Sequence, residues 1–172
     1  REGVEPTQFP RLLRYGISNP PYASYAACAG GGRRMASYVP SADEQFVLDQ
    51  TAKGQVADFT ARAGYDENAK PGLRADFIRT LLLGLEKDWR VAMPGIRVKG
   101  ARLNGRLDLS DCAGPLGGLA ALALDACDLP EDIDISGAHL ARFSIERSRF
   151  RGILGNGAEV DGDFSFTNAA PL

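Results

Sequence analysis

The chain has 172 residues, 44% of them apolar and 24% charged, and its net charge is −2. This composition is ordinary for a soluble globular protein, and it excludes the broad basic surface that attracts nucleic acid. The longest uncharged apolar run, residues 113–124, covers 12 residues, whereas a membrane-spanning helix needs roughly 20. We therefore expect no nucleic-acid partner and no transmembrane segment.

Residues 1–40 differ from the rest of the chain. They contain Gly30-Gly31-Gly32, show no sustained hydrophobic period, and carry no methionine before Met35. Prolines and polar residues break up the apolar stretch that a secretory signal would need. Two interpretations remain open: an upstream extension ahead of a true start at Met35, or a disordered N-terminal arm.

A helical pattern begins at Ser41. Ser41 followed by Glu44 fits a capping box, in which each side chain bonds a backbone N–H of the other residue. Gly54 is well placed to end this first helix. We assign residues 41–94 to a helical cap.

The strongest helix signal covers residues 73–83. One apolar stripe precedes Gly84 and consists of Leu73, Phe77, Ile78, Leu81 and Leu82. Arg74 and Arg79 lie off this stripe. A pair of arginines there could bind an anion, but we expect a solvated helix face.

From residue 95 the chain repeats itself. Residues 100–113 and 157–170 share the pattern Gly-Ala-x-aliphatic-Asn/Asp-Gly, and small residues recur at intervals of 10 or 11, with one interval of 15. The small residues are Ala101, Cys112, Cys127, Ala138, Ser148, Ala158 and Ala169. Alternating apolar pairs precede most of them, as in a strand. Such short units must stack to bury their apolar side.

A five-residue step explains this spacing. If five residues form one side of a square coil, the small residue and a larger apolar residue two places later both face inward, and stacked coils join by parallel hydrogen bonds. A coil then takes about twenty residues. Gly105, Gly137 and Gly162 are candidate corners for the extra residues, and residues 114–118 form a corner loop. Residues 95–172 would hold three to four coils.

This repeat resembles pentapeptide-repeat proteins, in which Ala-x-Leu-type units build a right-handed quadrilateral β-helix. From about residue 42 the chain resembles a narrower group of bacterial proteins. These combine a short helical head, here residues 73–84, with a Gly-x-x-Val/Leu-x-Gly-Ala segment, here residues 95–101, and degenerate coils. They are often described as membrane-associated oxidoreductases or as uncharacterised. The resemblance brings no catalytic motif with it.

The predicted fold class is therefore mainly β: a right-handed quadrilateral parallel β-helix, pentapeptide-repeat-like, with a small N-terminal α-helical cap. The three cysteines, Cys28, Cys112 and Cys127, form no Cys-x-x-Cys pair, so no zinc ribbon or thioredoxin-type site is expected. Cys112 and Cys127 occupy the small-residue position and should be buried like alanine. Unpaired cysteines favour a reducing compartment, and we expect a cytoplasmic protein.

Candidate chemical sites are few. Gly30-Gly31-Gly32 and Gly155-Asn156-Gly157 lack the strand and helix context of a dinucleotide-binding loop. The single histidine, His139, is expected on the surface, and Glu131-Asp132 in a turn. We therefore predict no catalytic, cofactor-binding or metal-binding residue, and no cofactor.

The sequence favours a non-enzymatic repeat scaffold that mediates protein–protein interaction or assembly, with an unknown protein partner. Two alternatives stay open. One is part of a membrane-associated oxidoreductase, as the resemblance implies. The other is an acidic DNA mimic that binds a topoisomerase; six arginines against 11 acidic residues from residue 101 onward, a net charge of −5, support it weakly.

The C-terminal end of the repeat lacks a closing element. The strand unit Phe164-Ser165-Phe166 is followed by only six residues and no amphipathic helix. Because natural solenoids generally carry atypical polar caps, we expect either a repeat truncated at this end or an open coil that pairs with another chain. Both predict self-association through the open C-terminal coil.

Overall fold

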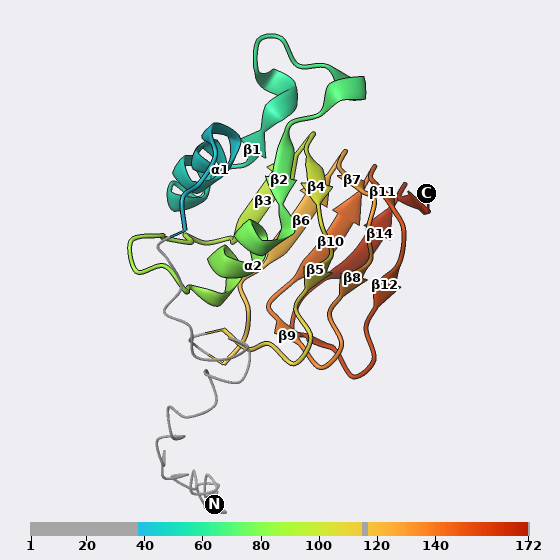
Figure 1. Ribbon diagram of the computed structural model, residues 1–172. Coiled ribbons are helices and arrows are strands. Elements are labelled where there is room, and N and C mark those ends of the chain that lie inside the picture. Colours follow the sequence, from blue (N-terminus) through green and yellow to red (C-terminus); the bar gives the residue numbers. More distant parts are fainter. Residues whose placement is uncertain (1–37, 115–116, 172) are drawn as a thin grey trace, which may run out of the picture.

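The computed structural model describes residues 38–114 and 117–171 (Figure 1). These residues form two α-helices, two short 3-10 turns and a series of short strands. The helical elements are α1 (Ala42–Ala52), η2 (Phe59–Ala61), η3 (Glu67–Ala69) and α2 (Ala75–Leu83). The strands are β1 (Ala57–Asp58), β2 (Gly72–Arg74), β3 (Ile96–Lys99), β4 (Arg102–Asn104), β5 (Leu107–Asp108), β6 (Leu122–Asp125), β7 (Asp128–Leu129), β8 (Ile133–Asp134), β9 (His139–Leu140), β10 (Phe143–Glu146), β11 (Arg149–Phe150), β12 (Ile153–Leu154), β13 (Glu159–Val160), β14 (Phe164–Thr167) and β15 (Ala170–Pro171).

The strands form four parallel sheets. Their orders are β1-β3-β6-β10-β14, β2-β4-β7-β11-β15, β5-β8-β12 and β9-β13. Leu122 pairs with Phe143 and Phe143 with Phe164, each 21 residues further along, which matches the expected coil of about twenty residues. Ile96 pairs with Leu122, 26 residues on, so that coil is longer than the later ones. The architecture is mainly β and compatible with a parallel β-helix.

The corners of the coils explain the small residues. Where the chain leaves the first sheet it passes through a positive φ at Gly100, Ala126, Arg147 and Asn168. The residue that follows each of these turns inward where space is short, so a small side chain is required. Cys112 and Cys127 are buried as expected. Gly162 lies at the corner between β13 and β14 but has no positive φ; a Cβ there would instead lie 2.8 Å from the carbonyl oxygen of Ala141.

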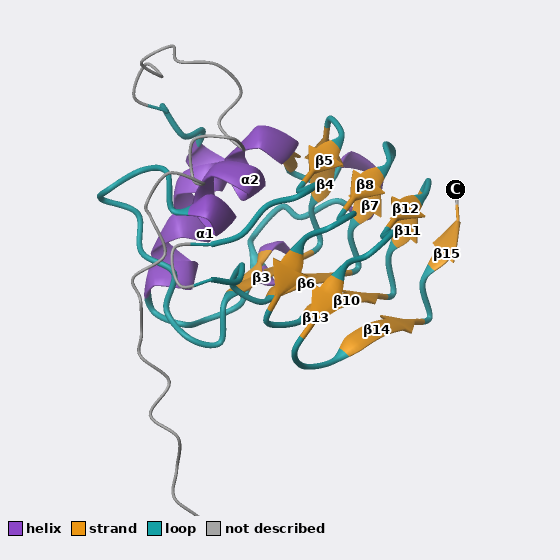
Figure 2. Cartoon of the chain, turned by 90° about the horizontal axis from the view of Figure 1, so that it is seen from below, coloured by secondary structure: helices purple, strands orange, loops and turns teal. Residues whose placement is uncertain are grey.

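Larger apolar side chains fill the interior of the stack. The inward pairs of the first sheet, Ile96/Val98, Leu122/Leu124 and Phe143/Ile145, are each 3% exposed or less. Figure 2 shows the coils closing around this interior, with the helices at one end of the stack. Neither helix among the described residues is long and apolar enough to cross a membrane.

The segment assigned to the helical cap, residues 41–94, also supplies strands. Gly72–Arg74 forms β2 and pairs with β4, so α2 begins at Ala75 and not at Leu73. Leu73 is buried because it pairs with Leu103 in the sheet, a position that the helical spacing alone could not distinguish from a helix start. β1 adds a rung to the first sheet in the same way. Helix α2 contacts β5, and α1 contacts β1 and β2.

Arg74 does not belong to a solvated helix face. Its Nε lies 2.8 Å from Oε1 of the fully buried Glu44, and a second nitrogen lies 2.5 Å from Oε2. Glu44 also accepts the backbone N–H of Ser41 at 2.8 Å, so the predicted capping box is confirmed. One carboxylate therefore joins the start of α1 to the start of α2, which the sequence did not indicate.

Candidate functional site

His139 serves a structural contact between coils. Its Nε2 lies 2.9 Å from Oδ1 of Asp161, and its Nδ1 lies 3.1 Å from the carbonyl oxygen of Gly117. The hydrogen bond and charge of Asp161 raise the pKa of the imidazole. Both ring nitrogens therefore have a partner: Nε2 contacts Asp161 of the next coil, and Nδ1 contacts Gly117 of the preceding coil.

The other sequence candidates lie apart from one another. Glu131 and Asp132 lie between β7 and β8. Oδ1 of Asp132 is 3.8 Å from Nε of Arg151. Gly155–Gly157 forms a turn between β12 and β13, while Gly30–Gly32 and Cys28 lie outside the described residues. Burial raises the pKa of the Cys127 thiol to about 11, which disfavours the reactive thiolate. Within residues 38–114 and 117–171 no group of three or more metal-ligating side chains comes together.

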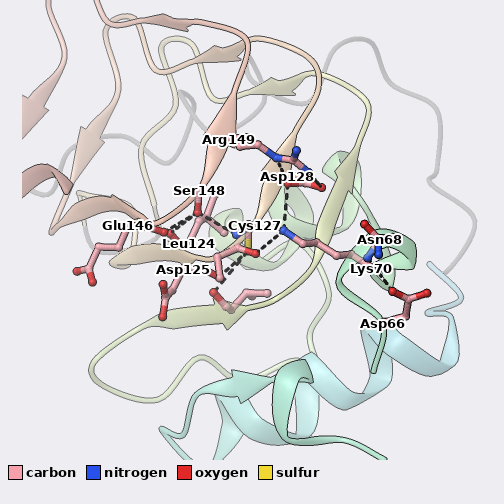
Figure 3. Close-up of polar contacts among 12 residues, drawn as sticks. Asp66, Asn68, Lys70, Leu124, Asp125, Cys127, Asp128, Glu146, Ser148 and Arg149 are labelled. Atoms are coloured by element: carbon pink, nitrogen blue, oxygen red, sulfur yellow. Dashed lines mark hydrogen bonds and ion pairs between the residues drawn. The ribbon is translucent and has the colours of Figure 1, made fainter. Parts of the chain in front are cut away.

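A cluster of polar contacts ties residues 41–94, which we call the head from here on, to the coils (Figure 3). Lys70, which is almost fully buried, donates to Oδ1 of Asp128 at 3.1 Å and to the carbonyl oxygen of Ala126 at 2.8 Å. Arg149 of the following coil donates two hydrogen bonds of 3.0 Å to the same carboxylate. Burial by itself would raise the pKa of Asp128. The hydrogen bonds and charges of Arg149 and Lys70 outweigh burial, so the pKa of Asp128 is lowered. This cluster stabilises the stack, and its partners are too far apart in sequence to be predicted.

The feature with functional potential is the open face of the stack, which we define as strands β12, β13, β14 and β15, residues 153–171. Each of the four sheets ends at one of these strands. Figure 1 shows them in red at the end of the stack opposite the helices. The outer backbone N–H and C=O groups of β12, β13 and β14 therefore face away from the described part of the chain, whereas the N–H of Ala170 in β15 bonds the carbonyl oxygen of Ser148 and Pro171 has no N–H.

The interior of the stack is uncovered at the open face. Phe164 and Phe166 continue the inward column of the first sheet, yet they are 51% and 41% exposed, whereas Phe143 one coil earlier is 0% exposed. Phe164 stacks on Phe143 with ring centroids 5.8 Å apart. Leu154, on the sheet opposite the first one, is 45% exposed and is in register with Asp134. Apolar side chains and strand edges thus lie on one surface.

A missing side chain deepens this surface. Leu109 and Ile135 occupy the same inward position in successive coils and are buried, but the third coil has Gly155 there. A Cβ on Gly155 would meet only the Ile135 side chain, at 3.5 Å. A cavity of about 270 Å³ lies at this point, lined by Ile135, Gly155, Ala158, Val160 and Phe164. Sequence analysis missed this gap, although the break in the aliphatic column at residue 155 was its signal.

Charges on the outside of the coils are paired between one coil and the next. The pairs are Arg106–Asp134, Asp125–Arg147, Asp128–Arg149, Asp132–Arg151, His139–Asp161 and Arg142–Asp163. At the open face the Asp161 and Asp163 side chains remain 70% and 74% exposed. Glu159, also exposed, forms no salt bridge with a described residue. One corner of the open face is therefore acidic.

Comparison with known proteins adds no assignment. No family model, no curated protein and no solved structure matches this chain. The resemblance to pentapeptide-repeat proteins thus remains an expectation from sequence. The functional argument depends on the geometry of the open face.

Proposed function

We propose that this chain is a non-enzymatic repeat scaffold that mediates protein–protein interaction or assembly through the open face. The observation that carries the proposal is the exposure of Phe164 and Phe166 on strand edges where earlier coils bury the same column. Exposed, flat, apolar strand edges are templates for pairing with another chain. Self-association is the simplest form of that pairing.

The finer architecture belongs to the same proposal. We assign the coils a right-handed quadrilateral path, as in pentapeptide-repeat proteins, because parallel crossover connections are right-handed in nearly all proteins. The helices act as the cap of the opposite end, since α2 lies against β5 and α1 against β1 and β2. Among the described residues, this arrangement leaves the open face as the uncovered end of the stack.

The two alternatives have weaker support. A DNA mimic needs unpaired negative charge along its length, but Asp125, Asp128 and Asp134 are all in ion pairs with basic residues. An oxidoreductase needs a cofactor cradle, and the glycines at 155–157 form a turn between strands and open no helix. The arrangement of these residues favours assembly over both.

Sedimentation velocity of the 172-residue chain across a concentration series tests the proposal. We expect the average mass to rise with concentration, and we expect the double variant Phe164→Ser/Phe166→Ser to stay monomeric. Met93→Ser is the matched control, because Met93 is 89% exposed on the head and lies away from the open face. Circular dichroism melts show whether each variant is folded.

A wild-type chain that remains monomeric at the highest concentration would contradict self-association. Equal association of the wild type and the double variant would place the contact elsewhere. Loss of association in Met93→Ser would show that the contact between copies lies on the head.

A further inference from the structure

We propose that His139 is a pH-dependent clamp, which joins three successive coils when its ring carries two protons and releases one of its partners when it loses a proton. His139 is the only histidine of the chain. It lies on β9 and reaches Gly117 of the preceding coil and Asp161 of the following coil. The clamp uses no unpaired strand edge, so this inference stands or falls independently of the proposed function.

Both partners of the imidazole ring accept hydrogen bonds and cannot donate them. Nδ1 of His139 lies 3.1 Å from the carbonyl oxygen of Gly117, and Nε2 lies 2.9 Å from Oδ1 of Asp161. A backbone carbonyl and an ionised carboxylate are acceptors only, whereas a neutral imidazole has one N–H and an imidazolium has two. The two contacts can therefore be hydrogen bonds at the same time only when the ring is an imidazolium.

The acids around the ring favour the same protonation state. The hydrogen bond with Asp161 raises the pKa of His139 most, and the charge of Asp161, the Gly117 carbonyl and the charge of Glu159 raise it too, against a smaller opposite effect of burial. Glu159 faces the histidine because the two residues are in register between β9 and β13. The folded chain therefore holds the second proton more tightly than an exposed histidine does.

The other neighbours of β9 bring no competing positive charge to the ring. The described residues of the loop at 113–119 have no charged side chain. At the corner before that loop, Asp111 lies against Gly137, because a Cβ on this glycine would meet its Oδ1. Arg142, the nearest basic residue along the chain, is paired with Asp163 at 3.1 Å.

Loss of one proton should release Gly117 and keep Asp161. A hydrogen bond to a carboxylate is stronger than one to a neutral carbonyl, so the remaining proton stays on Nε2. The lone pair of Nδ1 then faces the carbonyl oxygen of Gly117, and two acceptors repel. The backbone bonds that hold Leu119 to β9 do not titrate: its N–H bonds the carbonyl oxygen of His139 at 2.7 Å, and its carbonyl oxygen accepts the N–H of Ala141 at 2.9 Å. We therefore expect the change to be confined to Gly117 and the adjoining Gly118.

The sign of the pH dependence follows from the direction of the shift. The pKa of His139 is raised above its ordinary value of 6.5 in the folded chain. The clamp is therefore fully closed below pH 6.5, and it opens as the pH rises through the raised pKa.

An NMR titration of the isotope-labelled 172-residue chain tests the clamp, from about pH 5.5 to about pH 9. With one histidine, the ring nitrogen signals belong to His139 without ambiguity. We expect both nitrogens to be protonated at the acid end, a midpoint above 6.5, and the Nε2–H tautomer at the alkaline end. The backbone signals of Gly117 and Gly118 should shift with the same midpoint.

Three variants separate the clamp from a general effect of pH. Asp161→Asn should move the midpoint of the ring down towards 6.5, because it removes the charge of the strongest partner. Asp163→Asn, an exposed acid paired with Arg142, is the matched control and should leave the midpoint unchanged. His139→Gln keeps a polar side chain that does not titrate in this range, so the shift of Gly117 and Gly118 with pH should disappear.

Four results would overturn the proposal. They are a wild-type midpoint at or below 6.5, a midpoint that Asp161→Asn leaves unchanged, signals of Gly117 and Gly118 that do not follow the ring, and an Nδ1–H tautomer at high pH. None of these results depends on whether the chain self-associates, which sedimentation measures separately.

Discussion

Ala126 and Arg147 turn corners of the stack with φ values of 50° and 46°. This left-handed conformation costs a residue with a Cβ about 1–2 kcal/mol. Hydrogen bonds between coils hold both corners in place: the N–H of Ala126 bonds the carbonyl oxygen of Glu146, and that of Arg147 bonds Thr167, each at 2.9 Å. The spacing of small residues indicated where the corners lie, but no local pattern in Ala126 or Arg147 indicated a positive φ.

A β-branched residue at a corner should therefore be costly. We expect Ala126→Val to lower the free energy of unfolding by about 1–2 kcal/mol, because valine tolerates a positive φ poorly. Ala123→Val, on β6 of the same coil in extended backbone, is the control and should change stability by less than about 0.5 kcal/mol. Urea unfolding of both variants measures the difference, and equal stabilities would argue against strain at the corner.

Glu44 is the most consequential buried charge described. Burial raises its pKa, but the hydrogen bonds from Arg74 and from the backbone N–H groups of Ser41 and Arg74 outweigh this and lower the pKa from 4.5 to about 2. A carboxyl with a lowered pKa stabilises the folded state above its unfolded pKa. That contribution is lost as the pH falls from about 4.5 towards 2.

Glu44→Gln should remove this contribution at neutral pH. Losing one partner of a buried pair costs about 3 kcal/mol, the lower end of the usual range, because the Arg74 side chain is half-exposed. The stability difference from the wild type should shrink as the pH falls from about 4.5 to about 2. Asp49→Asn, exposed on the same helix, serves as the control. A difference that stays constant over this pH interval would contradict the assigned role.

At the scale of elements, helix α2 replaces a strand at the head of the stack. Phe77 is fully buried and packs against Trp89 with ring centroids 5.4 Å apart. Because α2 contacts β5, this apolar face covers the first rung of the third sheet. Burial of the stripe from Phe77 to Leu82 was predictable from helical periodicity, whereas the strand at Leu73 was not, since pairing with β4 overrides the local pattern.

The substitution Phe77→Ala measures how much the packing of α2 on the stack contributes to stability. We expect a loss of about 3–5 kcal/mol in the free energy of unfolding, because a large buried ring is replaced by a cavity. Asp76→Ala, exposed on the same turn, should change stability little. A change below about 0.5 kcal/mol in denaturant melts of Phe77→Ala would contradict a closing role for the helix.

Whether a feature could be predicted from the sequence depends on how far apart its residues lie along the chain. The parallel coils, the coil length and the buried small residues follow from periodicity, which is local information. The ion pairs Arg74–Glu44 and Lys70–Asp128 join residues 30 and 58 positions apart, so only the folded coils reveal them. The gap at Gly155 could have been predicted once the register of β8 and β12 was known, but paired residues are 20 positions apart in that sheet and 21 positions apart in the first sheet.

At the scale of the whole molecule, the two ends of the described stack differ. Helices lie against β1, β2 and β5 at one end, while β12, β13, β14 and β15 present bare edges at the other. On the sides of the stack, ion pairs such as Arg106–Asp134 and Asp128–Arg149 join one coil to the next. The open face is therefore the surface on which assembly is expected to depend.

Amide hydrogen exchange at two protein concentrations tests this central claim most directly. The account predicts that the outward amides of β14 exchange rapidly in dilute samples and become protected in concentrated ones, because association bonds this strand edge. Amides of β3 and β6, inside the stack, should be protected equally in both. Exchange of the β14 amides that is identical at both concentrations would contradict the account.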